Sequence, residues 1–174
     1  MVALRRTSEL YLIALGGNVR HGRFGLPEAV LRSAVAALGR IGAVEAVAPV
    51  VRSAPVGPSL RRYANGAAVL RCDLAPDAVL RALKGIEREF GRRRGRRWGS
   101  RVLDLDIVLW GGGVWRSPGL VVPHRLFRQR GFVLGPASAI APAWRDPVSG
   151  FTLRQLNRRL TRARPATRDT RPGA

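Results

Sequence analysis

The fold is decided by the stretch VLDLDIVLW, residues 102–110, which is the strongest strand signal in the chain. Every residue of this stretch is apolar except Asp104 and Asp106. Because side chains alternate across a strand, the two carboxylates share one face, while Leu105 and Ile107 pack on the other. We therefore expect a strand with one apolar face and one acidic face.

Apolar patterns on either side of this strand predict the elements around it. Before it, they predict a strand, a helix, two strands and a second helix, at residues 10–15, 27–39, 44–52, 65–72 and 76–91. After it, they predict a hairpin turn through Val114, a short strand and two helices, at residues 111–113, 120–123, 132–139 and 152–160. The order β-α-β-β-α-β is typical of the ferredoxin-like sandwich, in which helices cover one face of an antiparallel sheet and leave the other for ligands. The expected fold class is α+β, a ferredoxin-like βαββαβ sandwich with a C-terminal extension of short strands and helices.

Length and composition indicate one compact domain. The chain has 174 residues, 46% of them apolar, and two domains would each have too small a core. We place this domain at residues 1–160 and expect a basic, disordered tail at 161–174. No run approaches the roughly 18 to 20 apolar residues that cross a bilayer, and the lone Cys72 cannot form an intrachain disulfide. We therefore expect a soluble, cytoplasmic monomer that binds no membrane.

The net charge of +20 comes from 31 basic and 11 acidic residues. Such a charge favours nucleic acid or an anionic surface as a partner. All the basic residues except Lys84 are arginines, however, which is the skew that a GC-rich genome produces. We attribute much of the charge to composition, and we expect no specific nucleic-acid partner beyond non-specific, salt-sensitive binding.

The carboxylates of Asp104 and Asp106 form a candidate metal site. Adjacent like charges repel, and a divalent cation is the economical way to hold them together. Oxygen ligands favour Mg²⁺ or Mn²⁺ over zinc. The alternative is that both side chains simply face solvent; in either case, removing one is expected to leave the fold intact or more stable. Just before the pair, the arginine-rich residues 91–101 suit phosphate oxygens, which together with a metal indicates a polyphosphate ligand.

Neither a Walker-type phosphate loop nor a dinucleotide-binding glycine motif occurs in the chain. Instead, RWGSRVLDLDI at residues 97–107 resembles the 6-hydroxymethyl-7,8-dihydropterin pyrophosphokinases of folate biosynthesis. The resemblance runs from about residue 10 to residue 150. Supporting motifs stand in the family's order: ALGGN at 14–18, SAPVG at 53–57, YAN at 63–65, IE at 86–87, GR at 91–92, VPH at 122–124 and RGF at 130–132. The chain departs from the family pattern at Gly17, at Ser53-Ala54 and at Ser100, and its arginine loop is one residue shorter than in some members.

The resemblance implies that the diphosphate of ATP is transferred to the hydroxymethyl group of a reduced pterin, releasing AMP. Asp104 and Asp106 would hold two Mg²⁺ ions. Arg92 and Arg101 would stabilise the transferred group, and Trp98 would belong to a loop that closes over the site. The pterin would be bound by Ser53, Val56, Tyr63, Asn65 and Phe132, and ATP by Glu87, Ile107, His124 and Arg130. Taken singly, Glu87 is better explained as a helix-surface acid and Phe132 as a core residue. The alternatives for His124 and Arg130 are a packed loop histidine and a solvated charge.

Two other functions remain open on the sequence. Gly99-Ser100 followed by the aspartate pair is similar to the signature of metal-dependent nucleotidyltransferases, although the separation is too short. A ferredoxin-like sheet could also serve as an RNA-binding module, although the predicted strands carry carboxylates where stacking aromatic rings would be needed. Gly16, Asn18 and His21 are assigned structural roles. Lys84 and Cys72 are left out of the site because no partners for them are evident.

Overall fold

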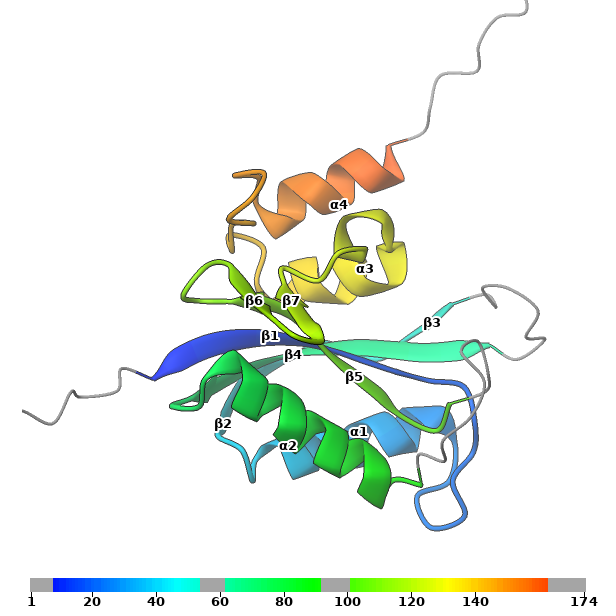
Figure 1. The fold of residues 1–174 in the computed structure, drawn as a ribbon. Coiled ribbons are helices and arrows are strands. Elements are labelled where there is room, and N and C mark those ends of the chain that lie inside the picture. Colours follow the sequence, from blue (N-terminus) through cyan, green and yellow to red (C-terminus); the bar gives the residue numbers. More distant parts are fainter. Residues whose placement is uncertain (1–7, 54–61, 92–100, 163–174) are drawn as a thin grey trace, which may run out of the picture.

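A sheet lies between two layers of helices in the computed structural model, which describes residues 8–53, 62–91 and 101–162 (Figure 1). The main sheet is five-stranded, with the order β2-β4-β1-β5 and with β3 also paired to β4. Its strands are β1 (Glu9–Gly17), β2 (Ala43–Val47), β3 (Val51–Ser53), β4 (Tyr63–Cys72) and β5 (Asp104–Trp110). All the pairings are antiparallel, and helices α1 and α2 intervene in the chain order, which confirms the ferredoxin-like α+β fold.

Two separate short strands replace the single strand predicted at residues 44–52. β2 pairs with the far half of β4 and β3 with its beginning, and residues 48–50 lie between them. The amide of Ala48 still donates to the carbonyl of Ala67 at 2.8 Å. Pro49 has no N–H to donate, so the ladder is interrupted there.

Helices α1 (Pro27–Leu38) and α2 (Pro76–Glu89) cover one face of the sheet (Figure 1). Each begins at a proline, whose fixed φ suits the first helical position and whose missing N–H costs nothing there. Their apolar faces bury the first core, which includes fully buried Leu105 of β5. The alternation predicted for β5 is therefore confirmed, with Leu105 and Ile107 turned toward these helices.

The chain after β5 covers part of the other face of the main sheet. The sequence pattern predicts that this face is available for ligands. It forms β6 (Trp115–Ser117), β7 (Leu120–Val122), the 3-10 helix η1 (Phe127–Gln129), α3 (Gly131–Ile140) and α4 (Leu153–Thr161). The predicted hairpin through Val114 would pair β5 with the strand that follows it, and this pairing is wrong. The following strand, β6, pairs with β7 in a separate two-stranded sheet. Helices α3 and α4 pack a second core against the main sheet. No helix in the described ranges is long and apolar enough to span a bilayer.

The loop between α3 and α4 is organised by Asp146, which is fully buried. Its carboxylate accepts two hydrogen bonds from Arg128, at 2.7 and 2.6 Å, and others from the backbone and hydroxyl of Ser149. Burial alone would raise the pKa of Asp146. The hydrogen bonds from Arg128 and Ser149 outweigh it and hold that pKa below the ordinary value of 3.8.

We expect Asp146→Asn to lower the free energy of unfolding by about 3 kcal/mol at neutral pH, because the buried pair loses one partner. A carboxyl whose pKa is lowered by folding stabilises fully above its unfolded pKa and loses that effect as the pH falls through the lower folded value. The gap between parent and variant should therefore shrink as urea unfolding is repeated from pH 7 down to about pH 3. The matched control is Asp73→Asn, at an exposed position, which should stay within about 0.5 kcal/mol of the parent. A gap that stays constant with pH would contradict this role.

Candidate active site

The acidic face of β5 continues across two neighbouring strands in one row. Gly16 of β1 is paired with Asp104 on one side and with Asn65 of β4 on the other. Directly paired residues of an antiparallel sheet project to the same face. Because Gly16 has no side chain, the floor between the carboxylate and the amide is bare. Ala14, which is paired with both Asp106 and Ala67, keeps the next row low as well.

Each aspartate of β5 has a cation beside it. Arg101 Nη1 lies 2.6 Å from Asp104 Oδ1, and Lys84 Nζ lies 3.8 Å from Asp106 Oδ1. The side chains of Asp104 and Asp106 are 27% and 36% exposed, so both remain within reach of a ligand. The omission of Lys84 from the site is thus corrected. The expected gain in stability on removing one aspartate is also reduced, because these cations already offset the repulsion.

Glu87 is fully buried, so its interpretation as a helix-surface acid is wrong. Its Oε1 accepts the backbone N–H of Leu105 at 2.8 Å and the ammonium of Lys84 at 2.6 Å. Glu87 shares the buried side of α2 with Val79 and Leu83, and this helical spacing is the sequence signal that could have indicated its burial. A contact of Glu87 with ATP stays a prediction.

The turn after β1 holds Arg101 in place. The amide of Asn18 donates to the Arg101 carbonyl at 2.9 Å, and the Arg101 amide donates to the Asn18 side chain at 2.9 Å. Gly17 is required by this contact, since a Cβ there would lie 2.3 Å from the carbonyl oxygen of Val102. The structural role assigned to Asn18 is confirmed. That of His21 is too, because its ring accepts the backbone N–H groups of Arg23 and Phe24 within its own turn.

His124 lies near the aspartate pair. Its backbone amide donates to the carbonyl of Val108 in β5 at 3.0 Å. The charges of Asp106, Arg130 and Asp104 act electrostatically on its ring. Burial lowers the pKa of His124 below its ordinary 6.5, although both carboxylates act in the opposite direction. The imidazole is therefore neutral at pH 7.

The remaining predicted site residues fall into four groups. Asn65 is buried on the site face, where its Nδ2 donates to Ser53 Oγ at 2.9 Å, and Tyr63 is paired with Ser53 in the register. Phe132 is half-buried against the second core, with the Arg130 guanidinium 5.8 Å from its ring centre. The side chain of Ile107 is buried in the first core, on the opposite face from Asp106, so contact with a ligand is left to its backbone. Val56, Arg92 and Trp98 lie outside the described residues.

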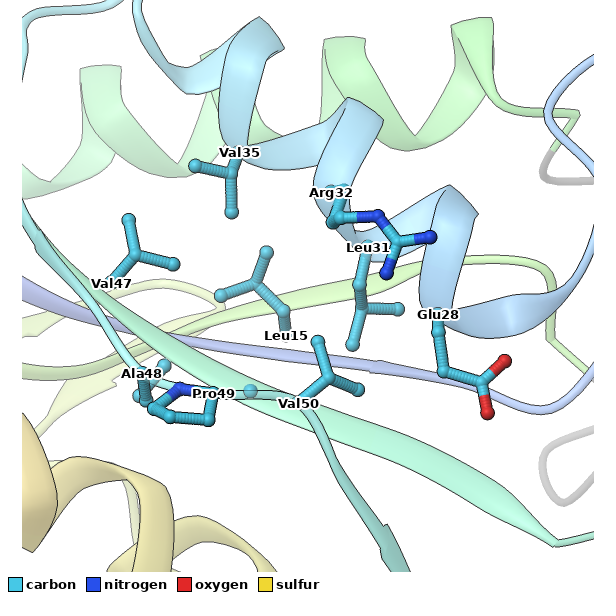
Figure 2. Close-up of a pocket in the computed structure, with 11 residues that line it drawn as sticks. Leu15, Glu28, Leu31, Arg32, Val35, Val47, Ala48, Pro49 and Val50 are labelled. Atoms are coloured by element: carbon cyan, nitrogen blue, oxygen red, sulfur yellow. The ribbon is translucent and has the colours of Figure 1, made fainter.

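A cavity of about 540 Å³ lies behind this row, between α1 and the segment joining β2 to β3 (Figure 2). Its walls are largely apolar, among them Leu15, Leu31 and Val50, with Glu28 and Arg32 on α1. Leu15 and Leu31 belong to the first core, so these walls of the cavity lie on the face opposite the carboxylates of β5. We therefore place the candidate site on the other face, over Gly16.

Comparison with known proteins gives consistent matches. Residues 12–142 match the family model for 7,8-dihydro-6-hydroxymethylpterin-pyrophosphokinase. A relative from Synechocystis is 38% identical over 83% of this chain and 73% of its own length, and one from Pseudomonas aeruginosa is 41% identical over 78% and 82%. Both are named 2-amino-4-hydroxy-6-hydroxymethyldihydropteridine pyrophosphokinase.

Among solved structures, the fold is similar to that of Plasmodium falciparum HPPK-DHPS. The TM-score is 0.67 at 12% identity, over 87% of this chain and 44% of that one. The present chain thus spans less than half the length of that protein, and the likeness concerns the fold alone.

The close approach of Gly17 to Val102 leads to a prediction about stability. Gly17→Ala should lower the free energy of unfolding by about 1 to 3 kcal/mol, because the added methyl group forces the two backbones apart. Gly16→Ala is the matched control, since its Cβ would meet Asn65 Oδ1 at an ordinary 3.6 Å and should leave stability unchanged or slightly higher. Urea unfolding of both variants measures the difference. Equal effects at the two glycines would contradict the importance of the Val102 contact.

Proposed function

The chain belongs to the 7,8-dihydro-6-hydroxymethylpterin-pyrophosphokinase family, and we propose that it transfers the diphosphate of ATP to 6-hydroxymethyl-7,8-dihydropterin. The products are AMP and the pterin diphosphate, an intermediate of folate synthesis. The observation that carries this function is the row of Asn65, Gly16 and Asp104, in a chain that matches the family from residue 12 to 142. In this proposal the Asn65 amide reads the pterin and the Asp104 carboxylate binds a metal ion, on either side of the bare floor at Gly16. No observation favours a nucleotidyltransferase or an RNA-binding module.

The aspartate pair suits Mg²⁺ bound together with a nucleotide. Mg²⁺ usually takes one or two carboxylates and completes its octahedral shell with water and substrate phosphates. Among the described residues, no group of three or more His, Cys, Asp or Glu side chains is arranged so that it could hold a metal ion. Asp104 and Asp106 would hold two ions. When bound, these ions would neutralise the phosphate oxygens and help activate the attacking hydroxyl group.

On the pterin side, Asn65 would recognise the amide edge of the ring by hydrogen bonds. Its Nδ2 is engaged by Ser53, which turns Oδ1 toward Gly16 as an acceptor for a ligand N–H. Tyr63 and Phe132 would flank the ring, as planar aromatic ligands favour. Val56 would complete the pocket. Ser53 thus acts by fixing the orientation of the amide that reads the substrate.

On the ATP side, Arg130 and the neutral His124 would contact the nucleotide, together with Glu87 and the backbone of Ile107. Arg101 and Arg92 would stabilise the negative charge on the group in transfer, and Trp98 would help to exclude water. The contact of Arg101 with Asp104 holds its guanidinium beside the proposed metal ligands.

We further propose that residues 1–160 work as a single, monomeric domain in the cytoplasm, without a membrane partner or a specific nucleic-acid partner.

Product analysis tests this function directly. Purified protein incubated with ATP, Mg²⁺ and 6-hydroxymethyl-7,8-dihydropterin should give AMP and a diphosphorylated pterin, both identified by mass spectrometry. Asp104→Ala and Asp106→Ala should each lower the rate by at least about a thousandfold, because the proposed metal ligands are lost. Their melting temperatures should stay close to that of the parent.

Two results would contradict the assignment. Transfer of AMP to the acceptor with release of diphosphate would indicate a nucleotidyltransferase. Mg²⁺-dependent activity retained in both aspartate variants would show that the metal is held elsewhere.

Arg101 provides a separate prediction. If its guanidinium acts mainly on charge that develops during transfer, Arg101→Ala should lower kcat by about a hundredfold while KM for ATP changes by no more than about threefold. Steady-state kinetics with both substrates varied measures the two constants. Arg116→Ala, at an exposed position of β6, is the control and should match the parent. A rise in KM with kcat unchanged would make Arg101 a ground-state binding residue.

A further inference from the structure

β5 lies at the outer end of the sheet order, so its pairing with β1 leaves one backbone edge without a neighbouring strand among residues 8–53, 62–91 and 101–162. Backbone groups on such an edge need other partners when they are not in water. At Leu105, side chains of α2 supply both partners. Glu87 Oε1 accepts the Leu105 N–H at 2.8 Å, and Lys84 Nζ donates to the Leu105 carbonyl at 3.1 Å.

These contacts close into a ring. Lys84 Nζ also donates to Glu87 Oε1 at 2.6 Å, and the two residues stand three positions apart on α2, where helical side chains are neighbours. Because Glu87 is fully buried, its charge must be compensated locally, and Lys84 provides that compensation. Each member of the ring therefore constrains the other two.

Leu105 is the residue between Asp104 and Asp106, so the ring fixes the backbone from which both carboxylates project. Lys84 extends from the ring toward the site, with its ammonium 3.8 Å from Asp106 Oδ1 and its side chain 29% exposed. We propose that Lys84 and Glu87 are positioning residues for the transfer reaction, which set the direction of the two aspartates by clamping the edge of β5 at Leu105. The proposal rests on the function proposed above.

Charge and position act in opposite directions at Lys84, which makes the two roles separable. If Lys84 acted only through its charge, removing that charge beside a cation site would tighten metal binding. If it acts by position, removing it should loosen metal binding, as loss of a partner that orients a metal ligand commonly does. The sign of the change in metal affinity therefore distinguishes the two roles. A residue of merely structural importance would leave the metal affinity of the folded protein unchanged.

The experiment compares Lys84→Met, which removes all donors, with Lys84→Gln, whose amide can still donate to Glu87 or the Leu105 carbonyl. Mn²⁺ affinity is measured by electron paramagnetic resonance with a non-hydrolysable ATP analogue, well below the melting temperature of each variant. Lys84→Met should weaken Mn²⁺ binding about tenfold and lower kcat by a similar factor, and Lys84→Gln should recover most of both. Arg81→Met, which removes an exposed cation from the same helix, should behave as the parent.

Tighter or unchanged Mn²⁺ binding in Lys84→Met would overturn the proposal, and so would an equal loss in Lys84→Gln. If Lys84→Met proves too unstable, Lys84→Gln still separates position from charge, because near-parental affinity fits the clamp and either tighter binding or a tenfold loss refutes it. The Mn²⁺ measurement requires no turnover. A parent protein that binds Mn²⁺ with the nucleotide but makes no pterin diphosphate would therefore refute the proposed reaction and leave the clamp to be judged on binding.

Discussion

The attachment of β5 to the rest of the molecule is the constraint on which the candidate site depends. This strand carries both proposed metal ligands, yet within the described ranges of the chain β1 is its one partner in the main sheet. Its other edge is held by contacts of different kinds, from α2 at Leu105 and from the segment at His124, whose amide donates to Val108. Catalysis by positioned charges tolerates little displacement. An edge strand can serve this purpose only if its free side is fixed, which these contacts achieve.

The charges around the aspartates are nearly balanced among the residues that the structure describes. Asp104, Asp106 and Glu87 bring three carboxylates to this corner, and Arg101 and Lys84 bring two cations. The carboxylates therefore do not depend on a metal to stay folded together, contrary to the simplest inference from their spacing. Their partial exposure is what leaves them available to one. Folding and metal binding are thus separable here, unlike in small zinc-dependent domains.

The sequence was sufficient for features that depend on local pattern. Alternation in residues 102–110 predicted which face of β5 is acidic, and prolines and glycines predicted where α1 and α2 begin and end. The sequence was insufficient where a contact with a residue far away in the chain determines the local structure. The split between β2 and β3 follows from Pro49 against β4, and β6 pairs with β7 instead of extending β5. Lys84 looked isolated although Glu87 lies three residues away on the same helix, because its other partners, Leu105 and Asp106, lie 21 and 22 residues further along on β5.

The ion pairs of the structure help to explain the large positive net charge of the chain. Carboxylates are scarce in this chain, and several are already committed to arginines, including Glu28 to Arg52, Glu45 to Arg71 and Asp146 to Arg128. Because the chain has 31 basic and only 11 acidic residues, most of its guanidinium groups have no carboxylate to neutralise them. Such a field attracts polyanions at long range and weakens as ionic strength rises. For an enzyme that binds ATP this raises the rate of encounter without adding specificity. In the proposed function, specificity comes from short-range groups such as Asn65 and the aspartates of β5. A chain of this charge is therefore understandable without any nucleic-acid partner.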